Sequence, residues 1–435
     1  MRGFFSEFRE MNYNVKLVFL FTFFQSFGRG IWMFSVLSAY IFFLADESYK
    51  LLGLTSAATG LAMTIIIFPS GYFADKYRRD SVLKIATIVG IIALSFAAFA
   101  DTILKIFVAL IFWGLFQGLN RPSLEAIFAD SVVTGNRSRI YSLKHSVQQF
   151  SMASGPFVNV ALFFYFGDDW KLSILKSVLL TGVIISFISV FILLLFKDER
   201  SIGEASESLK QPKISDDVAF DTNQSNRIIP YFLIGSNLLI GFGAGMTIRF
   251  FPIFFLEIYN LKPISVNLIM GLTAIATGIA SLGAQKLSLQ KGRAKMIFMV
   301  QITATACLFG LAFYPPLLIL IILFIARGAL MNAAQPLSRS ILMDTVPKHH
   351  RGKVNAIEGI AWGLFWNVSA VLGGYLIDFY DYRITFLITA TVYVFGSSLI
   401  LFIIPLVSKE VNSVEIDSKP MELITQSSTI GGRGK

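Results

Sequence analysis

The chain has 435 residues, of which 55% are hydrophobic and only 15% are charged, and its formal net charge is +10. Its mean hydropathy of +0.67 lies outside the range of ordinary soluble domains and predicts an integral membrane protein. The single Cys307 excludes an internal disulfide and a cysteine metal cluster, and with only three His we expect no metal centre.

Apolar runs of about 20 or more residues recur along the chain, which is the length that an α-helix needs to cross a bilayer. Continuous runs, rather than alternation with a period of two, favour helices over a β-barrel. We expect six spans in the first half of the chain, at about 15–44, 52–74, 81–100, 104–130, 141–166 and 173–196. Six more are expected after them, at about 228–257, 264–286, 294–314, 317–343, 353–378 and 384–407.

The predicted fold class is therefore an all-α membrane protein with twelve transmembrane helices in two six-helix bundles. The bundles comprise residues 1–196 and 228–407. Between them, residues 197–227 are polar, with few large apolar side chains, and are expected to form a flexible cytoplasmic linker. Residues 408–435 form a polar tail, which we expect to be disordered.

The second half of the chain copies the first. The stretch from Trp113 to Lys144 recurs from Arg327 to Glu358, and the matched pairs, each 214 residues apart, are Pro122 and Pro336, Asp130 and Asp344, Arg137 and Arg351, and Arg139 and Lys353. Such a long period indicates a duplicated half rather than a short repeat. Steps of four residues place a polar ridge on one helix face in each copy: Trp113, Gln117, Arg121 and Glu125, then Arg327, Met331, Gln335 and Arg339.

Lys and Arg in short loops predict the orientation. They gather in the loops on one side of the predicted bundles, whereas the opposite loops hold single cations, mostly beside Asp or Glu. We therefore expect both termini and the linker to be cytoplasmic, in a multi-pass protein of the cell membrane. This bias accounts for most of the net charge, so no nucleic acid partner is expected.

Ionisable side chains inside a bilayer are costly and usually face a cavity or each other. Arg29 lies in mid-span within Phe27-Gly28-Arg29-Gly30, and the seventh span echoes this pattern at 242–245. Helix packing is the favoured role of the glycines, with local unwinding as the alternative. We predict that Arg29 and Arg327 face a cavity, although Arg29 could instead bond neighbouring carbonyls. Arg249 could equally snorkel to the interface.

Opposite charges occupy equivalent places in the two halves, with Glu125 matching Arg339 and Lys144 matching Glu358. One hypothesis is that cytoplasmic ion pairs between the halves break when the protein changes conformation. The alternative is that each is an interfacial charge near the headgroups. Within the helices, Glu125 and Glu358 are also the candidate proton carriers, and their shallow depth suits a gate better than a central relay.

The loop Gly71-Tyr72-Phe73-Ala74-Asp75-Lys76-Tyr77-Arg78-Arg79 resembles the signature of the major facilitator superfamily. The sixfold repeat and the Asp-then-Arg junctions of both halves support the resemblance, which covers residues 15–407. It implies that the loop latches the cytoplasmic side in the outward-open state, and that Arg79 pairs with Asp130. The implied cytoplasmic gate consists of Gly71, Asp75, Arg79, Asp130, Arg137, Asp344 and Arg351.

The chain also departs from the family pattern. Arg78 replaces a usual Gly, Asp80 follows where a basic residue is common, and Leu287 replaces the Asp in the second half, which predicts an asymmetric latch. The Arg that proton-driven drug exporters often carry three residues before the Gln-Gly of the fourth helix is Gly114 here. This departure weakens a proton-antiport assignment.

If the family layout holds, the first, fourth, seventh and tenth helices line the substrate cavity with Gln25, Arg29, Trp113, Gln117, Arg121, Arg249, Arg327 and Gln335. Many arginines and few acids favour an amphipathic or anionic organic solute. We expect a monomeric secondary transporter working by rocker-switch alternating access, with efflux as the favoured direction and protons as a candidate coupling ion. The alternatives are an uptake carrier and a non-transporting receptor. No catalytic motif or cofactor site is legible, so no enzyme is predicted.

Overall fold

The computed structural model describes residues 8, 11–132, 137–202, 224–346 and 351–427, and these residues form helices without any strand. The N half contains α2 (Tyr13–Trp32), α3 (Ser35–Leu44), α4 (Tyr49–Lys76), α5 (Arg79–Ala98), α6 (Ile103–Ser131), α7 (Arg137–Phe166), α8 (Leu172–Ile192), η2 (Leu193–Leu195) and η3 (Asp198–Arg200). The C half contains α9 (Gln224–Thr247), η5 (Ile248–Phe250), α10 (Phe251–Tyr259), α11 (Pro263–Lys291), α12 (Arg293–Leu311), α13 (Leu317–Thr345), α14 (Arg351–Phe379) and α15 (Tyr382–Ser427).

Twelve spanning segments result, as the sequence predicts. Within the described residues, nine helices are long and apolar enough to cross a membrane, and the bent pair α2 and α3 makes a tenth. The remaining two, α7 and α14, have 30 and 29 residues but are more polar, and only Gly363–Phe379 of α14 qualifies as an apolar helix. Both face the other half, because α7 packs on α11 and α14 packs on α4. A helix covered by protein needs less apolar surface than one that faces lipid.

The first and seventh spans are broken, where the sequence predicts single helices. The helices α2 and α3 meet at an angle of 44°, and Phe34 between them leaves the helical region with φ −95° and ψ −103°. In the seventh span the 3₁₀ turn η5 separates α9 from α10, at whose start stands Pro252. Because Pro has no N–H to donate, it favours a break here. Hydropathy reflects only the composition of a segment, so it cannot reveal a change in the direction of the helix axis.

Polar caps fix where several helices begin. The side chain of Asn12 accepts a hydrogen bond from the N–H of Asn14, Ser48 accepts one from Leu51, and Thr102 accepts one from Lys105. These short polar side chains satisfy N–H groups that have no partner inside the helix. The caps of α4 and α6 lie in the same set of loops and define one end of the bundles.

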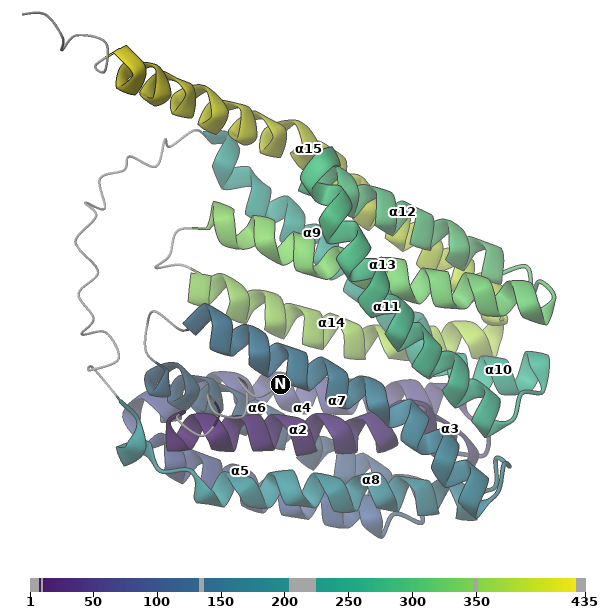
Figure 1. Ribbon diagram of the computed structural model, residues 1–435. Coiled ribbons are helices and arrows are strands. Elements are labelled where there is room, and N and C mark those ends of the chain that lie inside the picture. Colours follow the sequence, from purple (N-terminus) through teal and green to yellow (C-terminus); the bar gives the residue numbers. More distant parts are fainter. Residues whose placement is uncertain (1–7, 9–10, 133–136, 203–223, 347–350, 428–435) are drawn as a thin grey trace, which may run out of the picture.

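The last helix departs from prediction. We expected a disordered tail after residue 407, but α15 continues to Ser427 and projects from the C half (Figure 1). Several Lys and Glu residues follow residue 407, and such residues have good helix propensity. A polar segment outside the bilayer can therefore continue a helix that began inside it.

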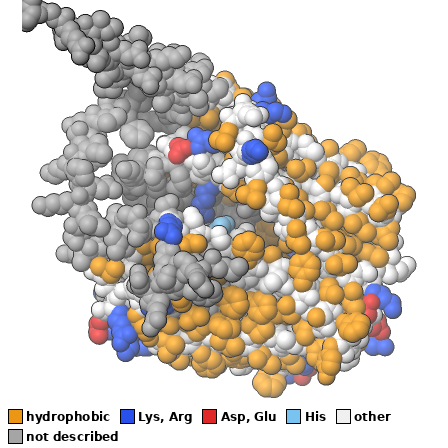
Figure 2. Space-filling view, viewed as in Figure 1, with side chains coloured by type: hydrophobic (Ala, Val, Ile, Leu, Met, Phe, Trp, Pro, Cys, Tyr) orange, Lys and Arg blue, Asp and Glu red, His pale blue; other side chains and the backbone are white. Residues whose placement is uncertain are grey.

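The two halves form separate bundles that meet along α4 with α14 and α7 with α11 (Figure 1). We call the end that holds the junctions α4–α5, α6–α7, α11–α12 and α13–α14 the basic end, because most loop Lys and Arg lie there. The other end is called the closed end. Hydrophobic side chains cover much of the surface in Figure 2, while charged side chains gather at its rims and in a recess between the bundles.

The glycines around Arg29 pack helices, as the sequence predicts. A Cβ added to Gly30 of α2 would lie 2.6 Å from the carbonyl oxygen of Met152 in α7, and one added to Gly28 would lie 2.4 Å from Ser186 Oγ in α8. The equivalent Gly245 of α9 would meet the carbonyl oxygen of Trp366 in α14 at 2.0 Å. The first helix of each half is thus wedged against later helices of the same half.

Candidate solute-binding site

Polar contacts between the halves concentrate at the closed end. Ser35 Oγ of α3 donates to Asn267 Oδ1 of α11 at 2.7 Å, and Asn159 Nδ2 of α7 donates to the same oxygen at 3.1 Å. All three side chains are buried. Lys50 and Asp378 add an ion pair of 2.6 Å between α4 and α14. None of these residues was singled out from the sequence, because nothing in the chain marks which polar residues meet across an interface.

A carboxylate also joins the halves at this end. Tyr49 and Tyr382 each donate a hydroxyl hydrogen bond of 2.6 Å to the carboxylate of Glu257 in α10. Glu257 is a further acid inside a helix, in addition to Glu125 and Glu358, which the sequence analysis considered as proton carriers. Tyr49 belongs to the N half and the other two residues belong to the C half, so the group closes the interface.

At the basic end, the described ion pairs stay within one half. Arg79 pairs with Asp130, which confirms the predicted partner. Its repeat counterpart is a pair between Arg293 and Asp344, which the sequence analysis did not foresee. The cleft between the bundles therefore opens toward the basic end, where Figure 2 shows a recess that contains Lys or Arg side chains.

The other predicted gate residues are less informative. A Cβ added to Gly71 would meet nothing within 4 Å. The side chains of Asp75, Arg137 and Arg351 lie outside the described residues, so their gate role stays a prediction.

The departures from the family loop have a local explanation. Arg78 Nε donates to Asp80 at 3.1 Å, and Arg78 also pairs with Glu199 of η3 at 2.8 Å. The backbone N–H of Arg79 donates to Asp198 at 3.2 Å. Arg78 thus binds the loop to the segment that follows the sixth span, and Asp80 holds the Arg78 side chain.

The hypothesis of ion pairs between the halves remains a prediction. Glu125 of α6 pairs with Lys144 of α7, inside the N half. Arg339 is exposed, and its charge acts on His145 of the other half. The side chain of Glu358 lies outside the described residues. Since the halves are apart at this end, pairs that form only on closure would be broken here.

Three arginines come from both halves, with Arg121 exposed and Arg29 and Arg249 half-buried. The positive charges of Arg29 in α2 and Arg121 in α6 lie within range of mutual repulsion, as do those of Arg249 in η5 and Arg29. Arg249 Nη2 donates to Asn367 Oδ1 of α14 at 3.2 Å. We call Arg29, Arg121 and Arg249 the arginine cluster.

The cluster has unmet bonding capacity. The Nε atoms of Arg29 and Arg249 are buried without a hydrogen-bond partner. No described acidic side chain forms an ion pair with any of the three arginines, although Gly359 lies against Arg121 and the side chain of its neighbour Glu358 is outside the described part. Like charges near one another in a partly buried site are unfavourable unless an anion joins them.

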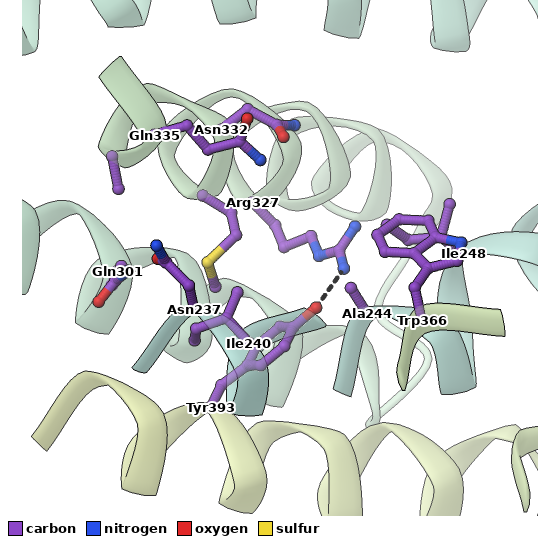
Figure 3. A pocket seen from close by; sticks show the side chains of 12 residues that line it. Asn237, Ile240, Ala244, Ile248, Gln301, Arg327, Asn332, Gln335, Trp366 and Tyr393 are labelled. Atoms are coloured by element: carbon purple, nitrogen blue, oxygen red, sulfur yellow. Dashed lines mark hydrogen bonds between the residues drawn. The ribbon is translucent and has the colours of Figure 1, made fainter. Parts of the chain in front are cut away.

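A second feature is a cavity of about 200 Å³ inside the C half (Figure 3). Its lining comes from five helices and the 3₁₀ turn, and consists of Asn237, Ile240, Ala244, Ile248, Gln301, Arg327, Met331, Asn332, Ala334, Gln335, Trp366 and Tyr393. Arg327 donates from Nη2 to the hydroxyl of Tyr393 at 3.1 Å. Two of the predicted cavity residues, Arg327 and Gln335, therefore line a cavity. We call this space the C-half cavity.

The structure does not bring all predicted cavity residues together. Gln25 accepts a hydrogen bond of 2.5 Å from Ser189 of α8, inside the N half. Trp113 is 1% exposed and packs edge to face on Trp32, with ring centroids 5.3 Å apart. Gln117 is half-buried. The arginine cluster and the C-half cavity thus carry the site, and Asn237, Gln301, Asn332 and Tyr393 join it without a signal that distinguishes them in the sequence.

Two pseudo-symmetric bundles that enclose a polar cleft closed at one end define the class of secondary transporters. A family model described as "Major Facilitator Superfamily" matches residues 18–317 and 233–426, so the chain belongs to this family. The family is one of membrane transporters, which agrees with the prediction of a transporter rather than an enzyme. The predicted family and twelve-helix fold are thereby confirmed.

Known relatives are distant. The uncharacterized MFS-type transporter YqjV of Bacillus subtilis is 23% identical over 228 residues, which are 52% of this chain and 53% of that protein. The chain thus matches about half the length of this curated relative. Among solved structures, a D-xylose-proton symporter is 16% identical with a TM-score of 0.68, covering 89% of this chain and 96% of that one. The nucleoside transporter NupG is 17% identical with a TM-score of 0.62, covering 89% and 98%. At such identities these structures show the fold alone.

Proposed function

We propose that this transporter carries a small anionic or amphipathic organic solute across the cell membrane by alternating access, and that it works in efflux. The observation that carries this proposal is the arginine cluster, in which two buried Nε atoms have no partner. Burying cations without counter-charges costs several kcal/mol, on the order of the cost of an unpaired membrane charge. An anionic solute supplies the missing charge and the missing acceptors.

The arrangement of the halves supports alternating access. Polar contacts join the halves at the closed end, while described ion pairs at the basic end stay within one half. Since cytoplasmic loops carry an excess of Lys and Arg, we assign the basic end, the linker and both termini to the cytoplasm. The described conformation is then open to the cytoplasm and presents the arginine cluster to cytoplasmic solutes. An exporter would load its solute in this conformation.

Flux through proteoliposomes tests the solute class. Labelled organic anions should cross, and Arg29→Gln should reduce their flux by about tenfold or more, the value of a charge-assisted hydrogen bond. Arg383→Gln, at the exposed start of α15, serves as the control and should leave flux unchanged. Flux of organic cations that is indifferent to Arg29→Gln would overturn the anion proposal.

Two further arms test coupling and direction. A pH gradient that drives accumulation would identify protons as the coupling ion, and its lack of effect would indicate facilitation or exchange. In cells, loss of an exporter raises the intracellular level of the labelled solute, whereas loss of an uptake carrier lowers it. Saturable binding without flux would identify the receptor alternative instead.

A further inference from the structure

The C-half cavity holds a cation that its surroundings do not neutralise. Arg327 is only 5% exposed, and its Nε atom is buried without a partner. Among the described residues, no acidic side chain forms an ion pair with Arg327. The rings of Phe251 and Tyr393 lie 5.0 Å and 6.0 Å from the guanidinium carbon. Cation–π contacts contribute about 0.5 to 2 kcal/mol, which is less than the cost of desolvating a charge.

The cavity is also rich in hydrogen-bonding amides. Asn237 comes from α9, Gln301 from α12, and Asn332 and Gln335 from α13. Gln301 is 2% exposed, and its Oε1 atom has no hydrogen-bond partner. In Figure 3 the Arg327 guanidinium and the Tyr393 hydroxyl point toward each other beside Trp366. An amide can offer either a donor or an acceptor, so this lining suits a polar group better than an alkyl chain.

The C-half cavity shares a wall with the arginine cluster. Ile248 and Trp366 line the cavity, and their neighbours in the chain, Arg249 and Asn367, form the hydrogen bond that belongs to the cluster. Consecutive residues on a helix point about 100° apart, so one turn of backbone can serve both sites. Two cationic sites therefore lie beside each other.

We infer that the C-half cavity is a second anion site, which binds an oxyanion group, a carboxylate or a phosphate, at Arg327 with hydrogen bonds from the surrounding amides. The inference rests on the proposed function, because the arginine cluster is taken as the first anion site. A volume of about 200 Å³ accommodates such a group with a few waters. The preferred solute is then a dianion, with one charged group in each site. The oxyanion can also come from a separate inorganic ion.

Matched carboxylates test the inference with the purified full-length protein. Succinate, glutarate and adipate are compared with butyrate, pentanoate and hexanoate by equilibrium binding. The wild type should bind the best dicarboxylate about tenfold or more tightly than the monocarboxylate of equal length, by one additional charge-assisted bond. Arg327→Gln should reduce this ratio to about one and leave monocarboxylate affinity in place. Arg29→Gln should weaken both series.

An inorganic phosphate arm distinguishes the two sources of the oxyanion. If the solute is a dianion, phosphate competes with the dicarboxylates. If a separate ion occupies the cavity, phosphate instead tightens binding of the monocarboxylates, and Arg327→Gln abolishes the effect. Both results support an oxyanion site at Arg327. A ratio that Arg327→Gln does not change, without any phosphate effect, overturns the inference.

Additional variants keep the test decisive. Should Arg327→Gln fail to fold, as judged by size-exclusion chromatography, Gln301→Leu removes from the same cavity an amide whose Nε2 atom is a hydrogen-bond donor. It should lower the affinity for dicarboxylates relative to the monocarboxylates of equal length, and a ratio equal to that of the wild type would overturn the inference. Arg383→Gln is the matched surface control. If the wild type binds none of these anions, the proposed function fails as well; if Arg29→Gln alone matters, only the second site fails.

Discussion

The two halves of the molecule share a frame but place their buried arginine on different helices. In the N half the first helix carries Arg29 and the fourth carries Trp113; in the C half the equivalent positions hold Ala244 and Arg327. Trp113 packs on Trp32 in the N-half core, whereas Arg327 and Ala244 line the C-half cavity. The two halves thus share the packing of their helices and differ in which helix carries the buried cation.

The largest effect is expected at the matched positions Trp113 and Arg327, where substitutions test the difference between the two halves. Trp113→Ala should destabilise the protein by about 3 to 5 kcal/mol, because it opens a large void in a packed core. Arg327→Met should leave the protein at least as stable as the wild type, because it removes a buried charge without a counter-charge. Unfolding by denaturant in detergent measures both.

The control for these variants is Phe164→Ala, an aromatic truncation at a side chain that is 84% exposed, which should change little. Equal losses at Trp113 and Arg327 would mean that both residues serve the core. The contrast between a packed core at Trp113 and an open cavity at Arg327 would then be wrong.

A smaller effect concerns the close helix packing at glycines that both halves share. Gly30→Ala and Gly245→Ala should each destabilise the protein by about 1 to 3 kcal/mol, because the new methyl group meets a backbone oxygen that cannot move aside. Gly278→Ala, where nothing lies within 4 Å, is the control and should be neutral or slightly stabilising. Thermal unfolding of the three variants measures the shifts. A loss of stability in only one of the two glycine variants would show that the helices pack less closely in the other half.

The smallest expected effect compares the two Arg and Asp pairs of the basic end. Asp130→Asn and Asp344→Asn should each cost no more than about 1 kcal/mol, as for other partly exposed ion pairs. The side chain of Asp130 is 35% exposed and that of Asp344 is 57% exposed, so the N-half variant should lose more. Stability in low and high salt measures the effect, with Asp169→Asn as a loop control. A larger loss at Asp344 would reverse the expected order.

Much of the fold was predictable because hydropathy and repeated spacings are properties of the sequence that do not depend on tertiary contacts. Apolar runs predicted all twelve spans, and the period of 214 residues predicted the duplicated halves. The resemblance to the family predicted the pair of Arg79 and Asp130. The breaks before Ser35 and at η5 were not predicted, because a bend changes the path of a helix without changing its composition.

The site was only partly predictable. The ridge of Arg327, Met331 and Gln335 lines a cavity, whereas the equivalent position of Arg327 in the N half, Trp113, lies in a core. The same spacing of four residues predicts one face for both ridges, but it cannot say what covers that face. The amides of Asn237 and Gln301 come from helices that are far apart in the chain, so no spacing links them.

The sequence by itself determined that this chain crosses a membrane in two copied halves, because hydropathy, charge bias and repeats are properties of each segment alone. Only the tertiary structure decided which arginines come near one another: Arg29, Arg121 and Arg249 form one cluster, while Arg327 lines the adjoining C-half cavity. The reason is that the surroundings of a buried charge depend on neighbours from other helices. Those neighbours are set by packing rather than by local sequence.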